Sequence, residues 1–229
     1  MQHFQPKRKT ELVIFDCDGV LVDSEMLSAS VLMKMMEEVG LPITPEIFRS
    51  DFLGRSFASA TERFERRVGK TFPPEFNAQY RVRLLDRMRG NLRSMMGVEK
   101  VLSSMIVPFC LATGSSPPRL DVSLNESKLG HFFTDRSFTA SDVKIGKPAP
   151  DLFLHVACAM NVDAMNCLVI EDSEMGVRAA LAAGMEVWHF AGGGHIKAGY
   201  RLPEDVVPHR VLDSMPALLD AFRKIGIAA

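Results

Sequence analysis

Residues 12–25 read LVIFDCDGVLVDSE, a short apolar run followed at once by two aspartates, Asp16 and Asp18. An apolar run of this length bounded by polar residues predicts a strand that is buried on both faces. Side chains two positions apart in extended backbone face the same way, so Asp16 and Asp18 are expected to share one side of the chain. The stretch therefore predicts a central strand that ends in a pair of carboxylates.

Three further apolar runs have the same form, at residues 106–112, 167–170 and 185–190. Helical patterns at residues 151–160 and 176–183 lie between these three runs. Alternation of strands and helices is typical of a doubly wound, mainly parallel α/β sheet, a Rossmann-like core. Right-handed crossovers would bring the carboxyl ends of these strands together at one edge, where such sheets bind ligands.

The segment from residue 25 to residue 93 differs from the rest of the chain. It holds four helix-like stretches rich in Met, Arg and Glu, at residues 27–39, 45–52, 58–68 and 75–88. Prolines and glycines lie between these stretches, at plausible helix ends. We therefore expect an α/β core made of residues 1–24 and 94–229, interrupted by an α-helical insert over residues 25–93.

Composition excludes several classes of partner. The 229 residues are 47% hydrophobic, and the 27 basic and 28 acidic residues are spread along the chain. This pattern offers no charged footprint to nucleic acid or to an anionic membrane.

No targeting or membrane-spanning segment is expected. The start of the chain lacks the apolar core of a signal peptide, and no run reaches the roughly 18 apolar residues of a membrane helix. The few cysteines, without a Cys-x-x-Cys pair, favour a reducing cytoplasm. The sequence leaves the oligomeric state open, and a monomer is one of the states it allows.

A second acidic pair, Glu171 and Asp172, follows the strand predicted at residues 167–170. If this strand lies beside the first one, four carboxylates converge, and they repel one another unless some are protonated or a cation lies among them. Hard oxygen ligands favour Mg²⁺. A simpler interpretation is that Asp172 or Ser173 only caps the next helix.

Two further stretches, without acidic pairs, are candidates for the same site. Thr113, Gly114 and Ser115 follow the run at residues 106–112, and Lys147 lies in the stretch KIGKPAP. A hydroxyl, free backbone amides and an ammonium group suit the oxygens of a phosphoryl group. Each stretch taken alone is also explained as an ordinary turn residue or a solvated loop charge.

Together, the stretches DCDGVLVDSE, LATGSS, KIGKPAPDLF and VIEDSEMGVRAA resemble the motifs of the haloacid dehalogenase superfamily, in the order of that family. The resemblance is to its phosphatase and β-phosphoglucomutase-like branch, which has a helical cap domain inserted after the first motif. It implies that residues 25–93 are this cap. It also implies that Asp16 is the nucleophile and that Asp18 is the general acid and base. Thr113 and Lys147 are then expected to bind the phosphoryl group. The implied ligands of Mg²⁺ are Asp16, the Asp18 carbonyl, Glu171 and Asp172.

The resemblance implies a Mg²⁺-dependent phosphatase that works through an aspartyl phosphate on Asp16. Its expected substrate is a small phosphorylated metabolite, such as a sugar phosphate or a phosphorylated sugar acid like phosphogluconate. Gly114 and Ser115 of the core and Arg55 and Ser56 of the insert are expected to contact this substrate.

Three alternative functions fit these residues less well. Dehalogenases of the superfamily lack the second aspartate and the metal, so Asp18 and Asp172 disfavour that reaction. Sugar phosphomutases are closer, but Ser28 stands where they have a His, and Phe57 stands where a cap Arg is expected. Phospho-receiver signalling domains also gather acidic residues, a Thr and a Lys, but their phosphoacceptor lies in mid-chain and they need no helical insert. Hydrolysis is therefore the favoured expectation. The run Gly192-Gly-Gly-His195 matches no phosphate-binding motif and is expected to be a flexible loop.

Overall fold

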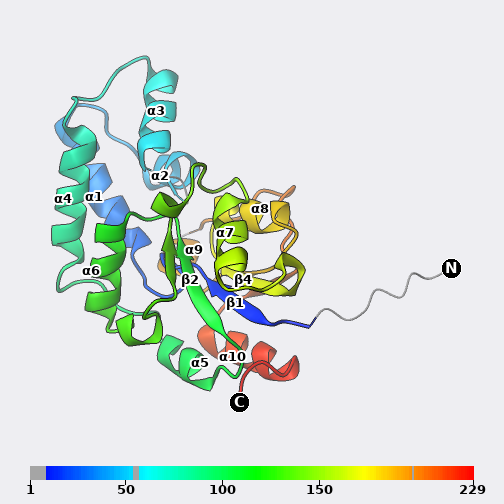
Figure 1. Ribbon diagram of the computed structural model, residues 1–229. Helices are drawn as coiled ribbons and strands as arrows, with labels where there is room; N and C mark the ends of the chain where they lie inside the picture. Colours follow the sequence, from blue (N-terminus) through cyan, green and yellow to red (C-terminus); the bar gives the residue numbers. More distant parts are fainter. Residues whose placement is uncertain (1–8, 54–56, 198) are drawn as a thin grey trace.

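A parallel sheet forms the centre of the protein in the computed structural model, which describes residues 9–53, 57–197 and 199–229 (Figure 1). In the described residues the sheet has six strands in the order β3-β2-β1-β4-β5-β6, and each neighbouring pair is parallel. The strands are β1 (Leu12–Phe15), β2 (Phe109–Thr113), β3 (Ser137–Thr139), β4 (Cys167–Glu171), β5 (Glu186–Phe190) and β6 (Arg210–Leu212). The predicted doubly wound α/β fold is confirmed, with the strand order reversing beside β1.

Strand β1 is central and apolar on both faces because helices cover the sheet from both sides. Val13 and Phe15 contribute to one hydrophobic core, while Leu12 and Ile14 contribute to the other. All four side chains are fully buried. The alternation follows from the two-residue repeat of extended backbone. It explains why a central parallel strand appears in the sequence as an unbroken apolar run.

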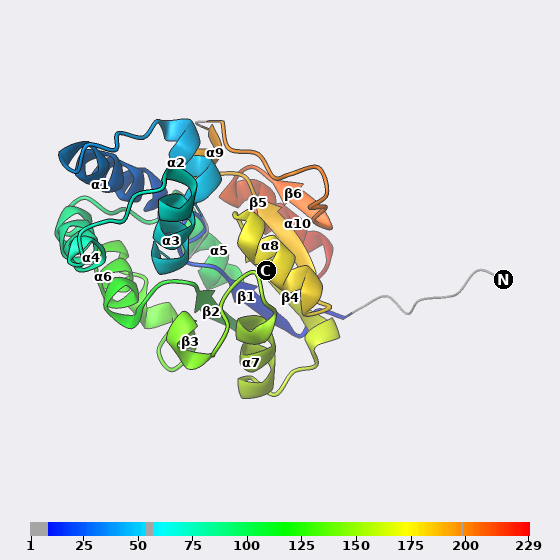
Figure 2. The same ribbon diagram turned by 90° about the horizontal axis from the view of Figure 1, so that it is seen from above.

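Helices of the core lie on both faces of this sheet (Figure 2). Helices α7 (Asp151–Ala159) and α8 (Glu174–Ala182) pack on the face of Leu12 and Ile14. The opposite face is covered by α5 (Val98–Ser104), α6 (Pro117–Ser127) and α10 (Met215–Lys224). The shorter elements are η1 (Gly130–Phe132), η2 (Ala140–Asp142), η3 (Ala164–Asn166) and α9 (Gly194–Lys197). None of the helices in the described residues has the length and apolar character needed to span a membrane.

The segment between β1 and α5 is helical. It forms α1 (Glu25–Glu38), α2 (Pro45–Asp51), α3 (Phe57–Val68) and α4 (Phe76–Met88), which lie together on one side of the molecule in Figure 1. These bounds agree with the predicted stretches to within two residues. Stacked aromatic rings help to hold the insert together: the ring centroids of Phe57 and Tyr80 are 3.7 Å apart, and those of Phe72 and Phe76 are 4.3 Å apart.

The helical insert leaves the core and rejoins it at adjacent points. Val22 forms an antiparallel bridge with Ser94, and the Asp23 amide donates to the Arg93 carbonyl at 3.1 Å. The Met95 amide donates to the Leu21 carbonyl at 2.8 Å. The two connections therefore run side by side.

Two strands were not among those predicted. Strands β3 and β6 have three residues each, and most of their side chains are partly or fully exposed. Both lie at the edges of the sheet, where a strand has only one neighbouring strand and is only partly covered. Fewer of its positions therefore need apolar side chains, and the apolar run that predicts a strand is missing. The predicted run at residues 106–112 begins as a strand only at Phe109, and Ile106 lies 63% exposed before it.

The packing of α7 is testable with two leucines of the same helix. Leu152 is fully buried against the sheet, whereas Leu154 is 43% exposed. Leu152→Ala should lower the free energy of unfolding by about 2–5 kcal/mol because it leaves a cavity in the core. Leu154→Ala should lower it by less than about 1 kcal/mol. Urea denaturation monitored by circular dichroism measures both, and equal losses would contradict this placement of α7.

Candidate active site

Polar side chains from three strands converge at the carboxyl edge of the sheet. Asp16 follows β1, Thr113 ends β2, and Glu171 ends β4 with Asp172 directly after it. All four are buried, with exposed fractions of 6% or less. Because parallel neighbouring strands end at the same edge, residues distant in sequence become neighbours here, as the sequence pattern predicted.

Lys147 joins two of these carboxylates. Its Nζ donates to Asp16 Oδ1 at 2.6 Å and to Glu171 Oε1 at 2.6 Å. The side chain of Lys147 is only 6% exposed, so these ion pairs are shielded from water. Burial opposes the charge of Lys147, but the two carboxylates outweigh that effect and raise its pKa well above the usual value. Lys147 is therefore a fixed positive charge at the base of the acidic cluster.

The acidic cluster still lacks positive charge. Asp16, Glu171 and Asp172 each place a carboxylate oxygen within 4.8 Å of the others, and Lys147 is the ammonium group paired with two of them. Burial, followed by the neighbouring negative charges, raises the pKa of Asp172 well above its usual range. Burial also raises the pKa of Asp16 despite the opposing charge of Lys147. A buried set of oxygen ligands with excess negative charge is chemically suited to Mg²⁺.

Glu171 is held in place by the start of α8. Its Oε2 accepts the backbone N–H of Ser173 at 2.9 Å and the Ser173 hydroxyl at 3.0 Å. Burial would raise the pKa of Glu171, but the charge of Lys147 and these hydrogen bonds lower it. The carboxylate lies so close to α8 that a Cβ on Gly176 would stand 1.7 Å from Oε1. Ser173 also caps α8 by accepting the Gly176 amide, so helix capping and carboxylate placement are combined here.

Gly19 lets the loop after β1 approach the loop after β4. It has a φ of +80°, a conformation that residues with a side chain rarely adopt. A Cβ at this position would lie 1.7 Å from Asp172 Oδ2. The Asp-x-Asp-Gly pattern therefore combines two carboxylates with the turn residue that allows Asp172 to come close.

The Asp18 carboxylate is surrounded by donors. Ser24 Oγ and Arg119 Nη2 donate to its Oδ1, the latter at 2.8 Å, and Ser115 Oγ donates to its Oδ2 at 2.6 Å. Burial alone would raise the pKa of Asp18, but the Arg119 charge and these hydrogen bonds lower it below the usual range. In this arrangement Asp18 is an ionised carboxylate.

Arg119 is a site residue that sequence reasoning missed. It lies in the first turn of α6 and also donates to the Ser28 hydroxyl at 3.2 Å, with Glu25 Oε1 at 3.7 Å. It thereby connects the core to the first helix of the insert. The available signal was its position three residues after the predicted LATGSS stretch, at the start of a helix that leaves the same sheet edge.

The remaining predicted site residues belong to the end of β2, to the loop after it or to the insert. Thr113 Oγ1 accepts the Ser115 amide at 3.0 Å, which shapes the loop after β2. Gly114 is exposed, and a Cβ there would have no heavy atom within 4 Å. Ser115 contacts Asp18 as described above. Arg55 and Ser56, expected to contact the substrate, lie outside the described residues.

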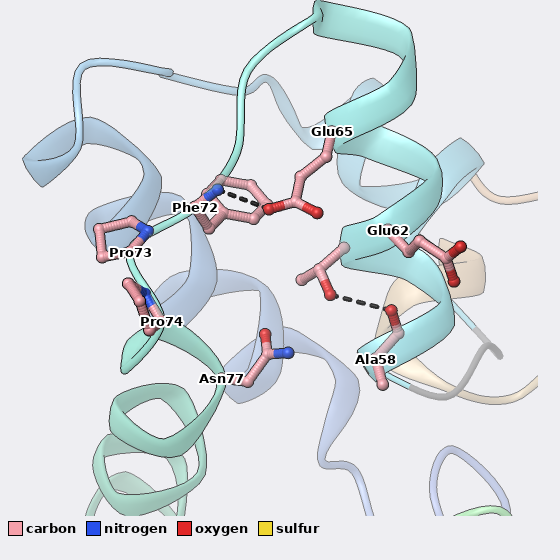
Figure 3. A pocket seen from close by; sticks show the side chains of 8 residues that line it. Ala58, Glu62, Glu65, Phe72, Pro73, Pro74 and Asn77 are labelled. Atoms are coloured by element: carbon pink, nitrogen blue, oxygen red, sulfur yellow. Dashed lines mark hydrogen bonds between the residues drawn. The ribbon is translucent and has the colours of Figure 1, made fainter.

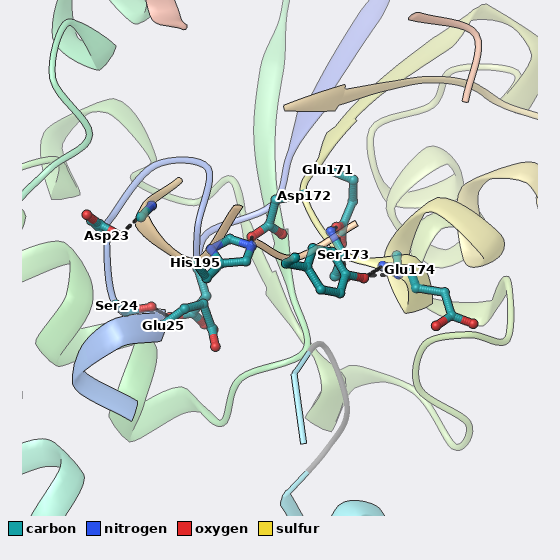
Figure 4. Close-up of polar contacts among 12 residues, drawn as sticks. Asp23, Ser24, Glu25, Glu171, Asp172, Ser173, Glu174 and His195 are labelled. Atoms are coloured by element: carbon teal, nitrogen blue, oxygen red, sulfur yellow. Dashed lines mark hydrogen bonds and ion pairs between the residues drawn. The ribbon is translucent and has the colours of Figure 1, made fainter. Parts of the chain in front are cut away.

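The run Gly192-Gly-Gly-His195, expected to be a flexible loop, is packed into this edge of the sheet. His195 is 2% exposed, and its Nε2 lies 3.1 Å from Asp172 Oδ2 (Figure 4). Burial lowers the pKa of His195, which favours the neutral ring. His195 is therefore a second residue beside the acidic cluster that the sequence pattern did not assign to it.

A hollow in the insert is separate from these residues (Figure 3). Its lining comes from α3, α4 and their connection, and consists of Ala58, Thr61, Glu62, Glu65, Phe72, Pro73, Pro74 and Asn77. Two of its polar groups are already paired inside the insert: the Phe72 amide donates to Glu65, and the Thr61 hydroxyl bonds the Ala58 carbonyl. None of the predicted site residues in the described part of the chain lines it.

Comparisons with known proteins agree with this geometry. A family model described as haloacid dehalogenase-like hydrolase matches residues 10–184. The chain is 31% identical to 6-phosphogluconate phosphatase of Escherichia coli, across 82% of this chain and 86% of that protein. It is 30% identical to a phosphorylated carbohydrates phosphatase of Thermotoga maritima, across 77% and 82% of the two chains.

Structural similarity extends over nearly the whole chain. A solved haloacid dehalogenase-like protein from Agrobacterium tumefaciens superposes with a TM-score of 0.78 at 32% identity, and the match covers 93% of this chain and 99% of that one. The family model and the names of the relatives confirm the expectation of an enzyme of the phosphatase type. This chain belongs to the haloacid dehalogenase-like hydrolase family.

Proposed function

We propose that the protein is a Mg²⁺-dependent phosphatase that transfers the phosphoryl group of a small phosphorylated metabolite to Asp16 and then to water. The observation that carries this proposal is the buried bridge of Lys147 between Asp16 and Glu171, beside Asp172. An anionic nucleophile approaches an anionic ester only where positive charge offsets their repulsion. The bridge supplies part of that charge in a water-poor setting.

Asp16 is suited to the role of nucleophile. Its Oδ1 is held by Lys147, which orients the carboxylate and leaves Oδ2 for attack on phosphorus. In the first step, an Asp16–phosphorus bond forms while the bond from phosphorus to the leaving oxygen breaks. In the second step, water attacks phosphorus and Asp16 is released. Mg²⁺, held by Asp16, the Asp18 carbonyl, Glu171 and Asp172, would supply further positive charge at this place.

Asp18 serves as the acid and base of these two steps. Its ionised state is ready to accept a proton from the attacking water. To protonate the leaving oxygen first, Asp18 must take up a proton, and the arrival of a phosphate dianion raises its pKa and favours this. Arg119 opposes that uptake as long as it remains paired with Asp18.

The loop after β2 is proposed to hold the phosphoryl oxygens. Thr113 accepts the Ser115 amide through its oxygen, so its own O–H remains available as a donor. The open space around Gly114 permits close approach of a ligand to the backbone. Lys147, from the loop before α7, places its Nζ 3.4 Å from the Ala112 carbonyl of the same strand and adds positive charge beside Asp16.

The insert over residues 25–93 is proposed to act as a cap domain that closes over the substrate and selects it. Its two adjacent connections to the core support a hinge at residues 21–23 and 93–95. Arg55 and Ser56 remain the proposed substrate contacts of this cap. Sugar phosphates and phosphorylated sugar acids are the proposed substrates, in keeping with the names of the relatives. We propose a cytoplasmic location, since the four cysteines are unpaired.

Substitution of the nucleophile tests the mechanism. Asp16→Asn should reduce phosphate release from an aryl phosphate by at least about 10³-fold, because an amide is a poor nucleophile toward phosphorus. Asp220→Asn, at an exposed carboxylate of α10, is the matched control and should retain full activity. Phosphate release is measured with Mg²⁺ present, and circular dichroism verifies the fold. Substantial turnover by Asp16→Asn would refute the proposed nucleophile.

The pH dependence of stability tests the cation site. The pKa values of Asp16 and Asp172 are raised by folding, so without Mg²⁺ their contribution to stability is lost as pH rises from about 4 through the folded-state pKa values. Mg²⁺ binds the deprotonated carboxylates. The gain in Tm on adding MgCl₂ should therefore grow as pH rises toward neutrality, at matched ionic strength with NaCl as the control. A gain that is absent or independent of pH would contradict the site.

A panel of phosphorylated metabolites identifies the substrate class. With Mg²⁺ present, phosphate release should be fastest for a phosphorylated sugar or sugar acid, 6-phosphogluconate included, and should stop on addition of EDTA. The comparison uses kcat/KM, which reports discrimination between competing substrates. Metal-independent release of halide from a haloacid would support the dehalogenase alternative instead, and interconversion of sugar phosphates without phosphate release would support the mutase.

A further inference from the structure

The loop after β5 places an imidazole against the acidic cluster without giving it an ordinary partner. His195 Nε2 lies 3.1 Å from Asp172 Oδ2, which is hydrogen-bonding distance, but the two groups are not aligned for a hydrogen bond. Both ring nitrogens are buried and make no hydrogen bond in the described part of the chain. A buried imidazole without partners is costly. Packing alone would be served better by an apolar side chain of the same size.

Glycines let this loop lie directly on the turn after β1. A Cβ on Gly193 would stand 2.8 Å from His195 Cε1 and 3.2 Å from the Gly19 carbonyl oxygen. A Cβ on Gly19 would stand 2.9 Å from His195 Cε1. The loop, the turn and the imidazole therefore fit together only with glycine at both positions. This close packing brings His195 to Asp172.

The loop is fastened on both sides of His195. The Gly194 amide donates to Asp23 Oδ1 at 3.2 Å, next to the start of α1. Tyr200 accepts the Glu174 amide on its hydroxyl at 2.8 Å, and its ring centroid lies 5.7 Å from that of His195. Figure 4 shows His195 between these two attachments. The imidazole thus has a defined position rather than a mobile one on a glycine-rich loop.

We propose that His195 is a positioning residue for Asp172: after a small rotation of its ring, Nε2–H donates across the 3.1 Å gap to Asp172 Oδ2 and sets the orientation in which this carboxylate would meet the cation. The inference rests on the proposed function, since Asp172 is a proposed ligand of Mg²⁺. Carboxylates that bind metals are commonly oriented by such hydrogen bonds. Direct ligation by His195 is the poorer role, because Mg²⁺ prefers oxygen ligands.

Two substitutions of similar length separate hydrogen bonding from packing. His195→Gln retains an N–H donor, whereas His195→Met fills the space without one. Isothermal titration of the full-length chain with MgCl₂, in the absence of substrate, measures the affinity directly. His195→Met should weaken Mg²⁺ binding by about 10-fold or more, the usual effect of removing a partner of a metal ligand, and His195→Gln should recover most of that loss.

The outcomes distinguish this inference from the function on which it rests. If the wild-type protein binds no Mg²⁺, the proposed metal site is wrong. If the wild type binds Mg²⁺ and His195→Met binds it equally well, or if His195→Gln is as weak as His195→Met, then His195 does not position Asp172. Circular dichroism and the Tm in EDTA verify that each variant is folded.

A measurement on the wild-type protein covers the case in which the variants do not fold. The ¹⁵N resonances of the His195 ring, assigned through contacts with Tyr200, report which nitrogen carries the proton. The proposal requires a protonated Nε2 in the metal-free protein and a shift of these resonances when Mg²⁺ is added. An unprotonated Nε2, or no response to Mg²⁺, would overturn it.

Discussion

The two ion pairs of Lys147, with Asp16 and with Glu171, are the interaction on which the rest of the site depends. Asp16 and Glu171 end neighbouring strands of one parallel sheet, so the fold itself forces two carboxylates into a buried space. Without an opposite charge their mutual repulsion and desolvation would be large. Lys147 comes from a loop more than a hundred residues after Asp16 and neutralises part of this charge. The excess that remains is what makes the cluster chemically suited to a divalent cation.

Close backbone approach is the second requirement of the site. Gly19 and Gly176 bring carboxylates to within distances that no side chain would allow. Gly193 does the same for the loop that carries His195. These glycines are not simply flexible linkers, because each one admits a specific charged or aromatic group. The acidic cluster therefore depends on three loops, after β1, β4 and β5, that pack against each other.

Arg119 connects the chemistry of the core to the helical insert. It pairs with Asp18 beside the proposed nucleophile and also contacts Ser28 and Glu25 at the start of α1. A movement of the insert relative to the core would change the surroundings of the same guanidinium that lowers the pKa of Asp18. The state of the proposed acid and base is thus physically linked to the position of the proposed cap.

The sequence by itself determined the α/β class, strand β1, the four insert helices and the order of the site motifs. These features depend on apolar periodicity and turn residues within a few positions, which local sequence encodes. Only the tertiary structure decided that Arg119 and His195 lie beside the acidic residues and that β3 and β6 pair at the edges of the sheet. Arg119 lies 101 residues from Asp18, and His195 meets Asp172 only after two loops pack together. Such contacts are selected by the packing of the whole chain, so a local pattern does not name the partner of either residue in advance.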